Sequence, residues 1–386
     1  MSRIDDLIAE YCPDGVKHQT LGEIGEFIRG NGIQKRDFQD SGFGCIHYGQ
    51  IYTYYGLFAD HTKSFIDPNL AEKRKKAYKG DLVIATTSEN EEDVCKACAW
   101  LGEEPIAISG DAYIFRHHQN PKYISYCFQS ELFQSQKKKY ITGTKVLRVN
   151  GDAMAKIHVP VPPLPVQEEI VRILDSFSSL EAELEAELEA RRKQYTHYRD
   201  ELLKFERVLI ASLGELCKIS VGRKNGTAGE FGEYPYVNAG TSMSGFVNEW
   251  SEEGDCVTTP SRGQGGMGFV AYQASRFWCG PLCYVMRSKH SDVMIKYVYY
   301  YLCSHKADIL GLVHEGGTPA INKSELAGLR ILVPPFEEQQ RIASILDRFD
   351  KLTNDLSSGL PAEIEARHKQ YEYYRDRLLS FDELAA

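Results

Sequence analysis

Several features that would define whole classes of proteins are missing from this 386-residue sequence. No apolar run reaches the roughly 18 to 20 residues that a membrane-spanning helix needs. The first residues, from Met1 to Asp6, carry acids where a secretory signal would carry basic and then apolar residues. We therefore expect a cytoplasmic protein without a membrane segment.

The ten cysteines are scattered along the chain and form no metal-binding pattern. Cys95 and Cys98 have CxxC spacing, but no second such pair and no histidine pair at zinc spacing accompanies them. Scattered cysteines in a chain of this length favour reduced, buried thiols over a disulfide scaffold. We therefore expect no metal site.

The motifs of common nucleic-acid enzymes are also missing. The nearest match to the Asn-Pro-Pro-aromatic motif of amino-methyltransferases is Asn120-Pro121-Lys122. No acidic residue is followed two positions later by lysine, as in a common nuclease metal site. The glycine-rich stretch 263–268 lacks the Lys-Ser/Thr pair of a phosphate-binding Walker loop. We therefore expect no catalytic residues and no bound cofactor.

The net charge of −9 is unfavourable for binding to nucleic acid, but its distribution matters. The acidic excess lies in residues 1–16, 163–206 and 334–386, whereas residues 17–162 and 207–333 are close to balance. Nucleic-acid binding is therefore not excluded, but it would need local basic patches.

An internal repeat organises the chain. Residues 162–177 (PPLPVQEEIVRILDSF) match residues 334–349 (PPFEEQQRIASILDRF), and residues 189–205 (EARRKQYTHYRDELLKF) match residues 365–381 (EARHKQYEYYRDRLLSF). Two such blocks in the same order indicate a duplicated unit, in which a globular block precedes each helical block.

Helical periodicity defines the blocks 163–206 and 334–386. Their apolar residues recur at steps of three, four or seven, which places them on one helix face. As one helix of roughly 39 residues, the first block would measure about 60 Å, which is long for the core of a single domain. We interpret the two blocks as long antiparallel helices that form a coiled-coil spacer. The alternative is a core-facing helix of a single domain.

The two helical blocks differ in their middle sections. The first contains a tandem Leu-Glu-Ala-Glu repeat over residues 180–190, and each such tetrad adds about 6 Å to a helix. If both globular blocks bind DNA, the tetrads set the spacing of the two sites; otherwise they form a solvated helix face. The second block contains Gly359 and Pro361, which predict a break or kink because proline cannot donate the helical hydrogen bond.

The blocks 17–162 and 207–333 combine short strand-like runs with turns and a few helices. The strand-like runs are 81–86, 269–272 and 282–286, and the helix candidates are Tyr123–Phe133 and Met294–His305. Each block is long enough for its own core. The predicted fold class is therefore α+β, with two globular α+β domains separated by two long helices and related by a pseudo-two-fold repeat.

Candidate DNA contacts are polar and basic residues in glycine-rich or turn-rich stretches, because loops can follow a groove. Arginine, asparagine and glutamine can make bidentate contacts to bases, whereas the lysines suit phosphates. For any single residue, an exposed solubilising side chain is an equally good interpretation, so only the set carries weight. The set comprises Arg29, Asn31, Gln34, Lys35, Arg36, Thr87, Ser88, Asn90, Lys137, Lys138, Lys139, Lys145, Arg223, Lys224, Asn225, Ser261, Arg262 and Gln264.

The alternation of variable blocks with Pro-Pro-Leu-Pro-Val-Gln-Glu-Glu-Ile and Lys-Gln-Tyr…Tyr-Arg-Asp blocks resembles the specificity subunit of type I restriction–modification systems. The resemblance covers essentially the whole chain. It implies that residues 17–162 and 207–333 are target-recognition domains for a bipartite double-stranded DNA target. It further implies that residues 163–206 and 334–386 separate these domains and dock two modification subunits. Residues 1–16 would pack near the C-terminal helix.

In that family the modification subunits methylate adenine with S-adenosylmethionine, and the restriction subunits, which join through the modification subunits, use ATP and magnesium. The resemblance thus implies no enzyme activity and no cofactor for this chain. It also implies partner-binding positions on the helical blocks, which are Gln167, Ile170, Leu174, Tyr195, Tyr198, Gln339, Ile342, Leu346, Tyr371 and Tyr374.

Two other classes of function remain open. A self-sufficient nuclease or methyltransferase is disfavoured by the missing motifs. A coiled-coil DNA-binding scaffold or regulator without restriction partners would carry the same helices.

Overall fold

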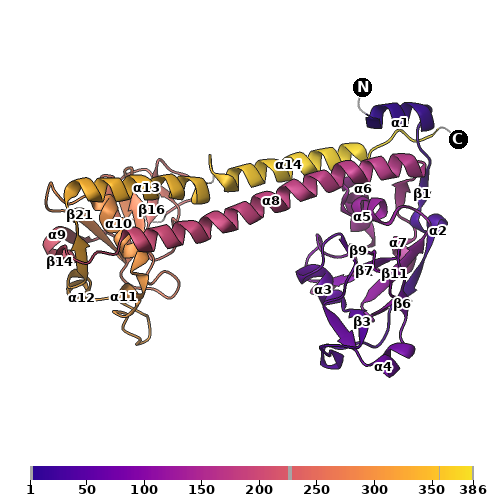
Figure 1. Cartoon of the computed structure of the whole chain (residues 1–386), viewed down its shortest axis with the longest axis horizontal. Helices are drawn as coiled ribbons and strands as arrows, with labels where there is room; N and C mark the ends of the chain where they lie inside the picture. The colour runs from indigo at the N-terminus through magenta and orange to yellow at the C-terminus, as the bar shows by residue number, and fades with distance from the viewer. Residues whose placement is uncertain (1–2, 225–227, 356, 385–386) are drawn as a thin grey trace. The chain divides into compact units, whose positions relative to one another are not determined.

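The computed structural model describes residues 3–224, 228–355 and 357–384. The chain divides into two compact units, residues 1–183 with 365–386, and residues 184–364. Each unit contains an α+β head with its own buried core. One helix, α8 (Leu164–Leu202), begins in the first unit and ends in the second (Figure 1).

Two sheets form the head of the first unit. The larger sheet has the strand order β2-β11-β7-β9-β4 and the smaller one β5-β3-β10-β6, and the strand pairs β1-β13 and β12-β8 complete the head. The strands are β1 (His18–Thr20), β2 (Gly25–Arg29), β3 (Phe43–Ile46), β4 (Phe58–Ala59), β5 (Ser64–Ile66), β6 (Lys76–Ala77), β7 (Leu82–Ala85), β8 (Thr87–Ser88), β9 (Lys96–Trp100), β10 (Ile106–Ile108), β11 (Ala112–His117), β12 (Leu147–Arg148) and β13 (His158–Pro160).

Helix α5 (Pro121–Gln129) packs against β9 of the larger sheet. It begins where the side chain of Asn120 accepts hydrogen bonds from the backbone of Lys122 and Tyr123, with Pro121 in the first turn. The other helices of this unit are α1 (Arg3–Tyr11), α2 (Leu21–Ile24), α3 (Tyr48–Thr53), α4 (Pro68–Glu72), α6 (Glu131–Lys137) and α7 (Gly151–Met154), with short 3-10 helices at Lys35–Asp37 and Lys138–Tyr140.

The head of the second unit contains a sheet of order β15-β21-β18-β19, a sheet of order β17-β16-β20 and the pair β14-β22. The strands are β14 (Leu209–Ser212), β15 (Cys217–Val221), β16 (Tyr234–Val237), β17 (Phe246–Val247), β18 (Cys256–Pro260), β19 (Ala271–Gln273), β20 (Trp278–Cys279), β21 (Cys283–Ser288) and β22 (Arg330–Val333). The helices are α9 (Leu213–Leu216), α10 (Ile295–Ser304), α11 (Lys306–Leu310), α12 (Lys323–Ala327) and α13 (Phe336–Asn354), followed by α14 (Leu360–Leu378).

The two heads are copies of one topology. The run β2-β11-β7-β9 corresponds to β15-β21-β18-β19, and all neighbours in both runs are antiparallel. Each smaller sheet contains one parallel pair, β3-β10 in the first head and β16-β20 in the second. Capping boxes open α2 and α9, formed by Thr20 with Glu23 and by Ser212 with Glu215. The predicted α+β fold class and internal repeat are confirmed.

Helix α8 is unbroken over 39 residues. Its middle section is rich in alanine, glutamate and leucine, which have high helix propensity. Ion pairs four residues apart, Arg191–Glu187 and Lys193–Glu189, add support. Within the first unit, Phe177 stacks on Tyr374 and Glu181 contacts His368, so the start of α8 and the end of α14 run antiparallel.

The predicted break in the second helical block is confirmed, because α13 ends at Asn354 and α14 begins at Leu360 (Figure 1). A Cβ atom at Gly359 would lie 2.5 Å from the carbonyl oxygen of Lys351, so only glycine fits this turn. Pro361 is the second residue of α14, where a missing N–H group is tolerated.

Most predicted elements of the heads match the structure. The three strand-like runs correspond to β7, β19 and β21, and the helix predicted at Met294–His305 corresponds to α10. The single helix predicted at Tyr123–Phe133 is wrong. Ser130 is extended there and ends α5, and its side chain accepts a hydrogen bond from the backbone of Phe133 to cap α6.

The N-terminal segment contacts the C-terminal segment within the first unit. The backbone N–H of Val16 donates to the carbonyl of Asp382 at 2.9 Å, and the N–H of Leu384 donates to the carbonyl of Val16 at 3.1 Å. These hydrogen bonds connect the C-terminal segment to Val16, which lies just before β1.

Candidate nucleic-acid interface and helix junctions

In each head, the predicted DNA-binding loops leave the main sheet at one end. In the first head, β2 ends at Arg29 and β7 ends at Ala85, and both lie beside the first residues of β11. In the second head, β15 ends at Val221 and β18 ends at Pro260, beside the first residues of β21. A predicted loop set directly follows each of these four strand ends. The shared topology therefore brings two sets together in each head.

A cavity of about 400 Å³ lies at this end of the first head. Arg29 contributes to its wall, where its Nε donates to the carbonyl of Gly110 at 3.1 Å. The pairing of β8 with β12 places Thr87 opposite Arg148, and both line the cavity. The lining comprises Arg29, Thr86, Thr87, Asp111, Tyr113, Tyr140, Thr142, Arg148, Val149 and Asn150. Two arginines, one aspartate and several neutral polar residues line it, an arrangement suited to a hydrogen-bonding ligand.

Tyr140, Thr142, Arg148 and Asn150 are among the polar residues of this cavity that the sequence analysis missed. They come from one segment, which is folded back on itself because the N–H of Thr142 donates to the carbonyl of Arg148 at 2.9 Å. The prediction included Lys145 from this segment for its charge. Arg148 carries the same charge three positions further on, so its positive charge could have identified it as a candidate DNA contact.

The other predicted residues of the first head differ in how freely they face solvent. Asn31 is held within the head, since its Oδ1 accepts from the N–H of Lys75 at 2.8 Å and its Nδ2 donates to the carbonyl of Lys73 at 3.2 Å. Ser88 is half-buried. The exposed members are Gln34, Lys35, Arg36, Asn90, Lys138, Lys139 and Lys145.

Lys137 does not face solvent, in contrast to the phosphate contact predicted for it. It is 1% exposed, and its Nζ donates to the carbonyls of Glu91 at 2.7 Å and Val94 at 3.0 Å. Burial lowers the pKa of this amine. Lys137 therefore anchors the 91–94 turn, and a role in binding phosphate does not fit its position.

In the second head, Arg223, Lys224, Arg262 and Gln264 are exposed and Ser261 is half-buried. Asn225 lies outside the described residues. The loop that carries Arg262 is held against the 313–321 segment, because the N–H of Gly263 donates to the carbonyl of Pro319 at 3.0 Å. Gly263 has φ +144, a conformation that favours glycine.

Each head is joined to its helix by the same buried glutamine. The Oε1 of Gln167 accepts from the N–H of Asn120 at 3.0 Å, and its Nε2 donates to the carbonyl of Pro162 at 2.7 Å. Gln339 repeats both bonds, with the N–H of Met294 at 2.9 Å and the carbonyl of Pro334 at 2.9 Å.

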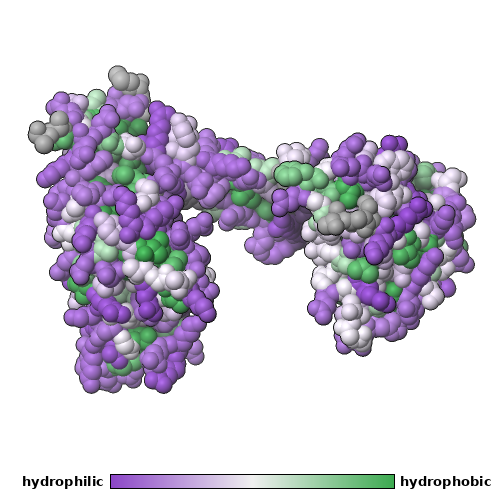
Figure 2. Space-filling model, turned by 180° about the vertical axis from the view of Figure 1, so that it is seen from behind, coloured by the Kyte–Doolittle hydropathy of each residue, from purple (hydrophilic) through white to green (hydrophobic). Residues whose placement is uncertain are grey.

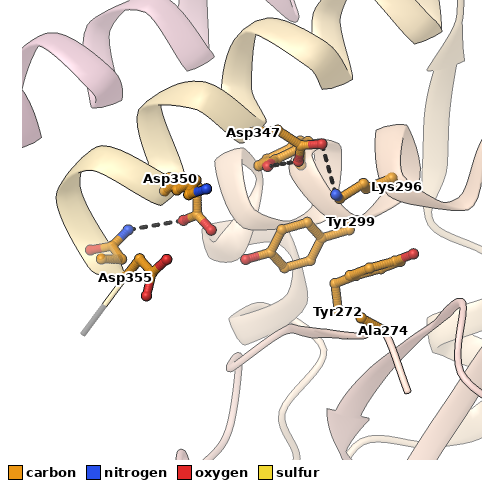
Figure 3. A pocket seen from close by; sticks show the side chains of 10 residues that line it. Tyr272, Ala274, Lys296, Tyr299, Asp347, Asp350 and Asp355 are labelled. Atoms are coloured by element: carbon orange, nitrogen blue, oxygen red, sulfur yellow. Dashed lines mark hydrogen bonds and ion pairs between the residues drawn. The ribbon is translucent and has the colours of Figure 1, made fainter. Parts of the chain in front are cut away.

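A lysine–aspartate–tyrosine cluster beside each glutamine completes the junction. In the second unit, Asp347 of α13 accepts from Lys296 at 2.7 Å and from the hydroxyl of Tyr300 at 2.5 Å, both on α10 (Figure 3). Burial, and then the neighbouring Asp347 carboxylate, raise the pKa of Tyr300, so its hydroxyl remains a donor. The first unit has the same cluster in Asp175, Lys122 and Tyr126, at 2.6 and 2.8 Å.

The structure places most predicted partner-binding positions inside these junctions. Seven of them are at most 5% exposed, which are Gln167, Ile170, Leu174, Gln339, Ile342, Leu346 and Tyr371. Their side chains hold the heads to the helices and present little surface to another protein. Tyr195 and Tyr374 are half-buried, and Tyr198 is 43% exposed.

Within the described parts of the chain, no group of three histidine, cysteine, aspartate or glutamate side chains is arranged to hold a metal ion. No described helix is long and apolar enough to cross a membrane. The cysteines are free, and burial raises the pKa of Cys95 and Cys98 to about 12.

Comparison with known families gives a match over most of the chain. The family model described as "Type I restriction modification DNA specificity domain" matches residues 13–190 and again residues 208–366. Each match covers one head and the repeat block that follows it, residues 162–177 in the first match and residues 334–349 in the second.

Individual relatives agree with the family match. The sequence is 35% identical over 273 residues to a type I restriction enzyme specificity subunit of Escherichia coli, and the alignment spans 60% of this chain and 65% of that subunit. Among solved structures, a type I restriction–modification S subunit from M. genitalium is similar with a TM-score of 0.62 and 14% identity, over 94% of this chain and 96% of that one. A chain from a structural study of type I R-M assembly has a TM-score of 0.59 and 17% identity, over 95% and 98%.

Proposed function

Because the chain belongs to the family of type I restriction modification DNA specificity domains, we propose that its two heads recognise the two parts of a bipartite double-stranded DNA target. Residues 17–162 form one target-recognition domain and residues 207–333 the other. Residues 163–206 and 334–386 are the helical segments that hold these domains, and residues 1–16 belong with the C-terminal segment.

Family membership makes this chain a DNA-recognition component of a type I restriction–modification system rather than one of its enzymes, as the sequence predicted. Methylation and cleavage would then be carried out by separate subunits. The exposed faces of the helical segments dock two modification subunits in this proposal, and restriction subunits join through them.

The equivalent placement of polar loops in both heads supports the proposal most directly. Loops that leave the same end of two equivalent sheets give two similar faces, each with its own side chains. In the first head, Arg29 and Arg148 suit phosphate or guanine, and Gln34 and Asn90 suit base edges. In the second head, the exposed Arg223, Lys224, Arg262 and Gln264 have these roles.

Substitution of Arg148 tests this assignment. In the full chain complexed with its modification subunits, Arg148→Ala should weaken binding to the methylation-mapped target duplex about tenfold, because a buried or bidentate arginine contact contributes roughly 1–3 kcal/mol. If Arg148 contacts phosphate, the slope of log K against log salt also falls by about one. Fluorescence anisotropy at several salt concentrations measures both quantities.

Lys79→Ala is the matched control, since Lys79 is an exposed basic residue of the same head and pairs with Glu103 on the surface. It should leave both affinity and salt slope nearly unchanged. Equal effects of the two substitutions, or no effect of Arg148→Ala, would remove the cavity from the DNA interface.

A further inference from the structure

The smaller sheets of the two heads differ at one edge. In the first head, the segment between β5 and β7 (residues 67–81, the β6 segment) adds strand β6 beside β10. In the second head, the counterpart segment between β17 and β18 (residues 248–255) makes only a single bridge, from Glu252 to Phe277, immediately before β20. The first head therefore carries a longer segment at this edge.

Within the β6 segment, the basic run Lys73-Arg74-Lys75 lies against the predicted DNA-binding loop that follows β2. The side chain of Asn31 joins the two segments, because it accepts from the N–H of Lys75 at 2.8 Å and donates to the carbonyl of Lys73 at 3.2 Å. Arg74 packs on the same loop, where a Cβ atom at Gly32 would lie 2.5 Å from its Nη1. The basic run is thus fixed at the end of the sheet where the loop begins.

The positive charges of the basic run are not neutralised by neighbouring acids. Lys73 and Lys75 are exposed and Arg74 is half-buried, with its Nε buried and without a hydrogen-bond partner. Among the described basic residues of the β6 segment, only Lys79 pairs with a carboxylate, that of Glu103. The end of the first head where α4 lies (Figure 1), directly before the run, has a largely hydrophilic surface (Figure 2). The run is therefore available to an anionic ligand.

The counterpart segment of the second head has the opposite charge. The β6 segment contains five basic and three acidic residues, whereas its counterpart contains four acidic residues and no basic one. Two of these acids pair with arginines of their own head, Glu252 with Arg287 at 3.2 Å and Glu253 with Arg276 at 3.0 Å. The second head therefore has no positive charge in this segment, and the segment neutralises positive charge elsewhere in the head.

We propose that Lys73, Arg74 and Lys75 bind phosphates of the DNA backbone beside the half-site that the first head reads, and that the second head has no equivalent site. This inference rests on the proposed function, since it assigns a backbone contact to one of the two heads. Contacts between basic side chains and phosphates release counterions and do not depend on the base sequence. The first head therefore supplies the larger share of the salt-dependent affinity and holds unrelated DNA more strongly than the second head does.

Lys73→Gln combined with Lys75→Gln tests the proposal in the full chain complexed with its modification subunits. Both side chains are exposed, and only the backbone groups of these lysines bond to Asn31, so folding is not at risk. The loss of two phosphate contacts should lower the slope of log K against log salt by about two. The affinity should fall by the same factor for the target duplex and for an unrelated duplex, because phosphates are common to both. Fluorescence anisotropy at several salt concentrations measures both quantities.

Lys79→Gln combined with Lys156→Gln is the matched control, since it removes the same charge from two exposed positions of the same head. It should leave the salt slope nearly unchanged. Ethylation of single phosphates locates the contacts on the DNA. In the wild-type complex, the phosphates whose ethylation blocks binding should extend further beside one half-site than beside the other. In the variant that lacks Lys73 and Lys75, ethylation of these additional phosphates should no longer weaken binding.

The possible results separate the two proposals. A wild-type complex that binds its target no better than unrelated DNA would overturn the proposed recognition function and this inference with it. If the target is recognised but the Lys73→Gln, Lys75→Gln variant keeps the wild-type salt slope, the phosphate site fails and the recognition function stands. A variant that loses affinity for the target alone would show that these lysines read bases. Equal ethylation interference beside both half-sites would overturn the asymmetry between the heads.

Discussion

The two heads are alike where they meet the helices and different where they end in loops. Gln167 and Gln339 make the same buried hydrogen bonds, and Asp175 and Asp347 accept from the same pair of side-chain types. At the other end, the first head has a cavity with Arg29 and Arg148, whereas the second has a glycine-rich loop that carries Arg262.

The junctions are constrained by folding, whereas the loops are constrained by what they bind. A junction must satisfy the same buried backbone groups in both units, so the same side chains recur. Loops at the end of a sheet have few packing constraints, so they can differ in sequence and length while the sheet beneath them stays the same. On the proposed function, that freedom allows the two halves of the DNA target to differ.

Shortening the unbroken helix should have the largest effect. Deleting residues 184–187, one Leu-Glu-Ala-Glu tetrad, shortens α8 by about 6 Å, comparable to the rise of roughly two base pairs. On the proposed function, both half-sites stay the same while the gap between them shrinks, so the original target is no longer methylated. Methylation mapping in a host that carries the variant with its partner subunits measures the gap.

The equal-length substitution Glu185→Gln is the control for this deletion and should leave the gap unchanged. A deletion variant that still methylates the original target would show that the tetrads do not set the spacing.

The equivalence of the two junctions is tested by removing the glutamines. Gln167→Leu leaves the N–H of Asn120 and the carbonyl of Pro162 without these partners in a buried site, which should cost about 3 kcal/mol of the free energy of unfolding. Gln339→Leu should cost a similar amount in the second unit. Denaturant unfolding of each variant measures the loss.

Gln340→Leu is the control, since this residue is adjacent to Gln339 but exposed, and it should have little effect. A large loss for one buried glutamine and none for the other would contradict the equivalence.

A smaller difference between the heads should appear in mild acid. Burial lowers the pKa of His117 in β11 to about 4, whereas the second head has Ser288 at the equivalent position of β21. His117 is thus neutral when folded but binds a proton when unfolded below about pH 6.5. The stability that it contributes above pH 6.5 is lost as pH falls towards 4, by about 2 kcal/mol at pH 5.

Unfolding measured from pH 7 to pH 4 should therefore show a steeper loss of stability in the wild-type chain than in His117→Ser. Parallel pH profiles for the two proteins would mean that His117 has an ordinary pKa in the folded state.

The sequence predicted the architecture well because the relevant signals are local. Heptad-like spacing on α8 and Gly359 with Pro361 at the break depend only on residues near one another in the chain, and the repeated blocks are visible by comparing the sequence with itself. The roles of single side chains were harder to predict. Gln167 and Gln339 were identified as repeated residues, yet their place inside the junction depends on strands and turns far away in sequence.

Sequence alone determined that this chain has two copies of an α+β head, each followed by a helical segment, and that the second segment is interrupted. Only the tertiary structure decided that Lys137 is buried while its neighbour Lys138 is exposed, that Arg148 shares a cavity with Arg29, and that Gln167 and Gln339 are buried in the junctions between heads and helices. The physical reason is that helical periodicity follows from bonds along a few residues, whereas burial depends on which distant segments pack against a side chain.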